Sequence, residues 1–197
     1  MTPRPGDYGV VRTGGRAARI IRWATRSTVN HAFVYVGNGL IVEAEPGGAV
    51  VSHVGKYGDR VTWSTGDIVA YCDTGGCLDR WFTPAERDDI VAKAYALAGW
   101  VHDGEHYIAH HKGIPYNWPD IVAIGLAQRR LGRLVTPRSW LARRLSRGDR
   151  LICSQLVDVC YEAAGLHLFT DHRPAGLVSP GDLLDLIRTH ERTPANV

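Results

Sequence analysis

Cys153 stands near the start of the segment LICSQLVDVC at 151–160, whose apolar spacing predicts an amphipathic helix. A cysteine at a helix N-terminus can act as a nucleophile, because the positive end of the helix and a nearby imidazolium both stabilise its thiolate. Helical geometry places Leu156, Val157 and Cys160 on the same face as Cys153. We expect this face to lie against the core, with Cys153 at its exposed start and Cys160 buried and inert.

The competing interpretation is that Cys153 is a small apolar core residue, because free cysteines are among the most buried residue types. His31 is the best imidazole partner for it, since it begins a predicted strand, HAFVYV at 31–36. A polar residue at the end of an otherwise apolar strand needs a hydrogen-bond partner if it is buried. Glu43, in the next predicted strand, is the candidate for that partner.

The connection between these two strands decides whether Glu43 can reach His31. A two-residue turn at 38–39 would pair Val34 with Glu43. The carboxylate would then lie on the face of the sheet opposite to His31, because side chains alternate along a strand.

A three-residue loop at 37–39 would instead pair Phe33 with Glu43 and His31 with Glu45. All of these side chains would then share one face of the sheet. We expect this odd-length loop, because glycine at both of its ends makes it easy to form. Glu45 is the alternative partner of His31 if the register differs.

The elements that must position these residues follow from the periodicity of the sequence. Runs with strand signals lie at 8–12, 31–36, 40–45, 49–54 and 67–72. The three central runs read as an antiparallel meander, with 67–72 as a fourth strand of the same sheet. Helical spacing occupies 15–26, 83–99, 119–131, 137–147, 152–164 and 180–189. Strands first and helices later predict an α+β fold with helices packed on an antiparallel sheet.

Length and composition favour one globular domain over residues 1–197, because 197 residues with 45% apolar side chains can bury one sizeable core. The longest apolar run, IVAIGLA at 121–127, is far shorter than the roughly 20 residues of a membrane-spanning helix. The first ten residues lack the apolar stretch of a signal peptide. We therefore expect a cytoplasmic protein without a membrane span.

Several motifs resemble those of the NlpC-type branch of papain-like cysteine hydrolases. They are the strand HAFVYVGNG, the following strand IVEA and the cysteine-led helix CSQLV. Because the histidine precedes the cysteine, the order is similar to the circularly permuted YiiX/YaeF-like group, which is related to the lecithin retinol acyltransferase-like families. PGDYGVV, GIPYNW and VSPGDLLDL also look like pieces of that pattern, so the resemblance covers nearly the whole chain.

The resemblance implies a Cys-His-Glu catalytic triad and a permuted papain-like fold. Cys153 would be the nucleophile, His31 the general base and later acid, and Glu43 the group that orients the imidazole. The thiolate would attack an amide carbonyl of a peptide or cell-wall peptide, form a thioester and release the acyl group to water. The N–H of Cys153 would supply one oxyanion-hole donor, and the second has no assignment. No cofactor or metal is expected.

Two other functions remain open from the sequence. The related families include thiol acyltransferases and thioesterases, so an acyl or lipid substrate is the first alternative. The second is a non-catalytic module that binds a polyanion through Arg129–Arg150, a stretch with eight arginines and one acid, Asp149. The same stretch is also typical of a solvated helix face.

Three further groups of residues suggest chemistry less strongly. His102, His106 and His110 have the spacing of ligands on one helix face, but glycines nearby favour a polar surface segment or a substrate-cleft loop over a metal site. Cys72 and Cys77 form a close pair that we interpret as loop thiols, with a disulfide or metal as the alternative. His53 is an alternative imidazole for Cys153, and His111 adjoins the histidine series.

Overall fold

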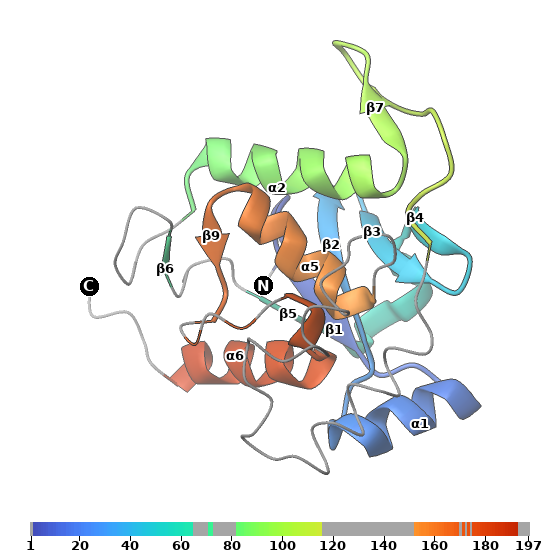
Figure 1. The fold of residues 1–197 in the computed structure, drawn as a ribbon, viewed down its shortest axis with the longest axis vertical. Helices are drawn as coiled ribbons and strands as arrows, with labels where there is room; N and C mark the ends of the chain where they lie inside the picture. The colour runs from blue at the N-terminus through green and yellow to red at the C-terminus, as the bar shows by residue number, and fades with distance from the viewer. Residues whose placement is uncertain are drawn as a thin grey trace.

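The computed structural model describes residues 2–64, 71–72, 82–115, 152–169, 171, 173 and 175–192 of the chain. These residues form a mixed α+β structure in which an antiparallel sheet is flanked by helices (Figure 1). The predicted helices at 119–131 and 137–147 and the basic stretch Arg129–Arg150 lie outside the described residues. The coarse prediction of an α+β fold is confirmed.

The main sheet has five antiparallel strands in the order β4-β3-β2-β1-β5. The strands are β1 (Tyr8–Val11), β2 (His31–Gly37), β3 (Leu40–Glu45), β4 (Gly48–His53) and β5 (Val61–Trp63). A 3₁₀ segment, η1 (Val54–Arg60), connects β4 to β5. The predicted meander of three strands is therefore confirmed as β2-β3-β4.

The prediction that residues 67–72 add a fourth strand to this sheet is wrong. Tyr71–Cys72 forms the short strand β6, which pairs with β9 (Leu166–His167) in a separate two-stranded sheet. The place beside β1 is taken by β5, whose Trp63 packs edge-on against the rings of Phe33 and Tyr35. The strand β5, which directly follows η1 in the sequence, therefore completes the sheet and packs the ring of Trp63 against β2.

The described helices are α1 (Arg16–Thr25), α2 (Pro84–Leu97), α5 (Cys153–Ala163) and α6 (Pro180–Arg192). All four match predicted helices. At the start of α2, Thr83 Oγ1 accepts a hydrogen bond from the N–H of Glu86 at 3.2 Å, and the Glu86 carboxylate accepts one from the N–H of Thr83 at 2.8 Å. These two bonds form a capping box, with Pro84 at the first helical position.

The connection between β2 and β3 combines a short turn with a bulge. Gly37 pairs with Leu40, so the turn has the two residues Asn38 and Gly39, both with positive φ. Val36 is an extra residue in β2, where the register shifts between Tyr35 and Gly37. The expected three-residue loop is therefore wrong, but the bulge restores the register that this loop was expected to give.

With the bulge in place, Phe33 pairs with Glu43, as the interaction between His31 and Glu43 requires. The two faces of the sheet then have different contents. Ala32, Val34 and Val36 belong to the main core, which they share with apolar residues of α2, α5 and α6. The other face carries a smaller cluster of Val11, Phe33, Ile41 and Tyr57, and we call this the second core.

Deletion of Val36 should remove the bulge and keep the register. Gly37 then follows Tyr35 directly, so with the turn unchanged Phe33 still pairs with Glu43 and the carboxylate stays in the second core. We expect a loss of about 2 kcal/mol in the free energy of unfolding, close to that of the control Val36→Ala, because both changes remove apolar contacts alone. Urea unfolding measures both. A loss of about 4 kcal/mol or more in the deletion alone would show that the register had moved and that the charge of Glu43 was buried without partners.

Candidate functional site

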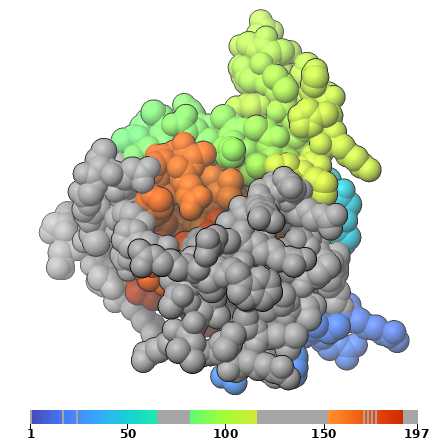
Figure 2. All heavy atoms as spheres, viewed as in Figure 1, coloured from blue at the N-terminus to red at the C-terminus, as the bar shows by residue number. Residues whose placement is uncertain are grey.

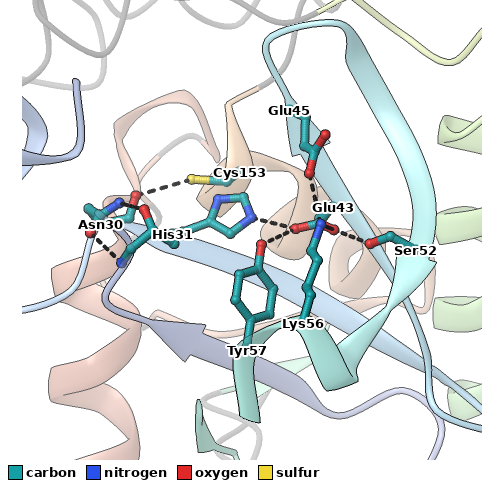
Figure 3. A network of polar contacts seen from close by, with 9 residues as sticks. Asn30, His31, Glu43, Glu45, Ser52, Lys56, Tyr57 and Cys153 are labelled. Atoms are coloured by element: carbon teal, nitrogen blue, oxygen red, sulfur yellow. Dashed lines mark hydrogen bonds and ion pairs between the residues drawn. The ribbon is translucent and has the colours of Figure 1, made fainter. Parts of the chain in front are cut away.

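The carboxylate of Glu43 is the centre of a buried polar network on β3, β4 and η1 (Figure 3). Its side chain is 0% exposed. Oε2 accepts a hydrogen bond from Tyr57 Oη at 2.5 Å, and it lies 2.7 Å from Nε2 of His31. Oε1 accepts a hydrogen bond from Ser52 Oγ and forms an ion pair with Lys56 Nζ. Both carboxylate oxygens are therefore fully satisfied by partners.

These partners decide the charge of Glu43. Burial alone would raise the pKa of this carboxyl group, because a charged form is costly away from water. Hydrogen bonds from His31, Lys56, Ser52 and Tyr57 outweigh this effect and lower the pKa from 4.5 to about 2. Glu43 therefore carries a negative charge throughout the physiological pH range.

His31 lies at the start of β2 between Glu43 and Cys153 (Figure 3). Nε2 faces the carboxylate, so Nδ1 is the ring nitrogen left for the thiol. Burial alone would lower the pKa of His31, but hydrogen bonds with Cys153 and Glu43, and the charges of those groups, raise it from 6.5 to about 9. An imidazolium is the form that stabilises a neighbouring thiolate.

Cys153 is the first residue of α5, which begins after Ile152 adopts an extended conformation. No side chain caps this helix end, so the N–H groups of its first turn point towards the site without an intrahelical acceptor. The expectation that Cys153 lies at an exposed helix start is wrong, because the residue is 2% exposed and belongs to the main core. Its Sγ lies 3.9 Å from the carbonyl oxygen of Asn30. The positive end of α5 and the imidazole of His31 therefore meet at the sulfur.

Asn30 holds the chain in place just before His31. Its side-chain oxygen accepts hydrogen bonds from the N–H of Thr13 at 3.0 Å and from Arg22 Nη1 at 2.7 Å. Its amide nitrogen donates to Thr13 Oγ1 at 2.6 Å. These bonds fix the backbone whose carbonyl contacts Cys153, so Asn30 positions the thiol and the imidazole relative to each other.

The structure distinguishes Glu43 from Glu45, the alternative partner of His31. Glu45 is 45% exposed and pairs with Lys56 at 2.8 Å, on the outer side of the network. His53, the alternative imidazole, is exposed and accepts a hydrogen bond at Nδ1 from the N–H of Gly55 at 3.0 Å. It caps η1, so neither Glu45 nor His53 takes part in the contact with Cys153.

Ser52, Lys56 and Tyr57 were missed by sequence reasoning. Ser52 lies two residues beyond Val50, the β4 partner of Glu43, and therefore shares its face of the sheet. That alternation was a usable signal. Lys56 and Tyr57 lie in η1, where neither strand nor helix periodicity applies, so no sequence pattern placed them beside the carboxylate.

The histidine-rich segment is an exposed hairpin and not a helix. Strands β7 (Trp100–His102) and β8 (Tyr107–Ala109) pair with each other, and the histidines of this segment are exposed. Within the described residues, no three His, Cys, Asp or Glu side chains lie together as a metal site would require. The exposure of these histidines agrees with the prediction of a polar surface segment. Cys77 lies outside the described residues, so the interpretation of Cys72 and Cys77 stays a prediction.

Cys160 behaves as expected from its place two turns into α5. It is fully buried in the main core, and burial raises the pKa of its thiol well above the ordinary value. Cys153 and Cys160 thus lie on one helix, yet only Cys153 has an imidazole beside it. This pair provides an internal comparison for any thiol reagent.

A narrow cavity adjoins Cys153, and neither His31 nor Glu43 lines it. Its walls come from α1, the start of α5 and the start of α6, and they are mostly apolar. The lining residues are Ile21, Thr25, Asn30, Ile152, Cys153, Ser154, Val178, Ser179 and Pro180. A small apolar group could therefore lie next to the sulfur.

Comparison of the sequence with models of known protein families, and with curated proteins, finds no match. Among the helices that the structure describes, none combines the length and the apolar character that a bilayer span requires.

The raised pKa of His31 predicts a pH-dependent stability. Because the folded state binds this proton more tightly, its contribution is complete below about pH 6.5 and is lost as the pH rises through about 9. We expect the free energy of unfolding to fall by up to about 3 kcal/mol across this window. Urea unfolding should show a much smaller fall in His31→Gln and the wild-type fall in the control His53→Gln. An identical fall in all three proteins would contradict the assignment to His31.

Tyr57→Phe should raise the pKa of Glu43 and lower the free energy of unfolding. Removing one donor from a buried carboxylate should raise its pKa towards 4.5 and cost about 1–3 kcal/mol at pH 7. Since the lowered pKa of Glu43 stabilises the fold above about pH 4.5, the difference from wild type should vanish as the pH falls through about 2. Tyr107→Phe, on the outer hairpin, is the control. A loss in Tyr57→Phe that does not change with pH would point to packing alone.

Proposed function

We propose that the chain is a cysteine hydrolase with Cys153 as nucleophile, His31 as general base and acid, and Glu43 as the orienting group. The observation that carries this proposal is the position of His31 between Glu43, which its Nε2 contacts at 2.7 Å, and Cys153, whose interaction with the imidazole raises the pKa of His31 (Figure 3). The resemblance to permuted papain-like hydrolases supports the same assignment, with one such domain over residues 1–197. It also supplies the substrate class, an amide bond in a peptide or cell-wall peptide.

In the proposed reaction, the proton of Cys153 moves to Nδ1 of His31 and the thiolate attacks the carbonyl carbon of the substrate. The oxygen of the tetrahedral intermediate becomes negative, and the N–H of Cys153 at the start of α5 donates to it. When the intermediate collapses, the C–N bond breaks and His31 gives its proton to the leaving nitrogen. A thioester on Cys153 remains.

Water then completes the cycle. His31 takes a proton from the water molecule as its oxygen attacks the thioester carbonyl, and the C–S bond breaks. The acid product leaves, and Cys153 recovers its proton from His31. Glu43 stays ionised throughout and keeps Nε2 of His31 occupied, so that the other nitrogen exchanges protons with sulfur.

A thiol acyltransferase or thioesterase is the second candidate. The apolar walls of the cavity beside Cys153 favour it. The cavity volume of about 10 Å³ admits roughly one water-sized group, so Ile21, Val178 and Pro180 would have to move apart to contact a longer acyl chain next to the sulfur. The same thioester intermediate would form, and only the leaving group or the final acceptor would differ. A panel of amide and acyl-ester substrates distinguishes the two candidates through their kcat/KM values.

Alkylation with iodoacetamide tests the nucleophile without knowledge of the substrate. We expect Cys153 to be labelled rapidly even at pH 6, where an ordinary thiol reacts slowly, because the imidazolium stabilises its thiolate. Cys160 in the same chain should stay unlabelled. Peptide mass spectrometry reads both sites at once.

Variants of His31 and Glu43 test whether these two residues activate Cys153. His31→Ala should slow the labelling of Cys153 at pH 6 by about tenfold or more, and Glu43→Gln should slow it too. Glu45→Gln is the matched control and should label like wild type. Labelling of Cys153 that is slow in wild type and indifferent to His31 would sink the proposal and leave Cys153 as a core residue.

A further inference from the structure

The outer face of α1 exposes two large apolar side chains side by side. Trp23 is 58% exposed and Ile20 is 48% exposed. Residues three apart in a helix lie on the same face, so these side chains form one patch. Figure 2 shows α1, in blue, at the edge of the molecule. We call Arg16, Arg19, Ile20 and Trp23 the α1 patch.

The segment that carries this patch has charges of one sign. Residues 8–42 contain five arginines and no aspartate or glutamate. Arg16 and Arg19 are exposed on α1 beside the two apolar residues. Arg22 turns inward to Asn30, and Arg26 lines a cavity with Asp182 and Asp185, so neither of these belongs to the patch. The four residues that form the α1 patch therefore combine two apolar side chains with two cations.

The helix that carries the patch is fixed before any ligand arrives. Ala18 and Ile21 are buried on its inner face. Arg22 Nη1 donates to the carbonyl oxygen of Thr13 at 2.7 Å and to Asn30 Oδ1 at 2.7 Å. Because α1 is already folded and anchored, a ligand of its outer face gains from the contacts without the cost of ordering the helix.

We propose that α1 docks the protein onto an anionic lipid bilayer. The helix lies in the plane of the membrane interface. Ile20 and Trp23 insert at the boundary between the headgroups and the acyl chains, and Arg16 and Arg19 lie at the lipid phosphates. Tryptophan suits this boundary, because its ring is apolar and its indole N–H is polar. Arginine pairs with phosphate oxygens through several N–H donors at once.

Other polyanions fit the patch less well. A nucleic acid would pair with Arg16 and Arg19, but it offers no apolar medium for the aliphatic side chain of Ile20. A protein partner would need roughly 800 Å² of contact on this chain, well beyond a patch built on two apolar side chains. Of these three partners, the lipid interface alone offers both an apolar layer for Ile20 and Trp23 and phosphates for Arg16 and Arg19.

Docking in this way brings the cavity of Cys153 close to the bilayer. Ile21 and Thr25 on the inner face of α1 line that cavity, so only the thickness of one helix, roughly 10 Å, separates it from the lipid. The inference itself does not rest on the proposed function. Cys153→Ala should bind vesicles as the wild type does.

Vesicle sedimentation tests the proposal. The full chain is mixed with vesicles of phosphatidylcholine alone, or of phosphatidylcholine with about one third phosphatidylglycerol. We expect binding to the mixed vesicles, weaker binding to the neutral ones, and a loss of binding as salt is raised. Fluorescence quenching by brominated lipids should report insertion of tryptophan, and this quenching should be reduced in Trp23→Phe.

Matched variants assign the binding to the α1 patch. The double variant Ile20→Ala/Trp23→Ala should bind mixed vesicles at least about tenfold more weakly, because two apolar side chains no longer leave water. Val101→Ala/Ile108→Ala is the control, since these residues are each 47% exposed on the β7–β8 hairpin, and it should bind normally. Arg16→Glu/Arg19→Glu should abolish the preference for anionic lipid. Thermal unfolding checks that each variant is folded.

Three results would overturn the proposal. They are no binding of the wild type to either vesicle, undiminished binding of the Ile20→Ala/Trp23→Ala variant, or an equal loss in the hairpin control. Binding to heparin with the same dependence on arginine but none on Ile20 and Trp23 would instead identify a soluble polyanion as the ligand.

Discussion

A negative charge buried without access to water is the constraint on which this site depends. Glu43 stays ionised only because Tyr57, Ser52, Lys56 and His31 surround its two oxygens with donors. Losing one donor would leave part of the charge uncompensated, so each of these residues has a structural as well as a chemical role. The bulge in β2, the end of β4 and the turn of η1 can all be understood as the means of bringing these donors to one carboxylate.

The sulfur of the site comes from a part of the chain that is distant in sequence from the sheet. Cys153 meets the carbonyl of Asn30 across 123 residues of sequence, because α5 packs on the main-core face of β2 and begins beside the start of that strand. Neither half forms the site alone. The sheet supplies the imidazole and its carboxylate, and the helix supplies the sulfur and a free N–H at its positive end.

Local rules predicted the local features well. The capping box of Thr83, the meander around Glu43 and the helix that begins at Cys153 all follow from short-range patterns. The bulge at Val36 could not be predicted, because a turn and a bulge together give the same register as a longer loop. Tyr57 lies in a 3₁₀ segment that no periodicity describes. The position of β5 depends on which edge of the sheet is free, and only the folded chain decides that.

The pairing of Lys56 with Glu43 also keeps the charge of the site balanced. With an ionised thiolate and imidazolium, the four side chains of Cys153, His31, Glu43 and Lys56 sum to zero. Once sulfur carries an acyl group and the imidazole is neutral, Glu43 and Lys56 remain as a balanced pair. In the proposed reaction the interior of the site is therefore electrically neutral before and after acylation. No counter-ion has to enter or leave with the substrate, and the chemistry avoids the cost of a net charge in a region of low dielectric constant.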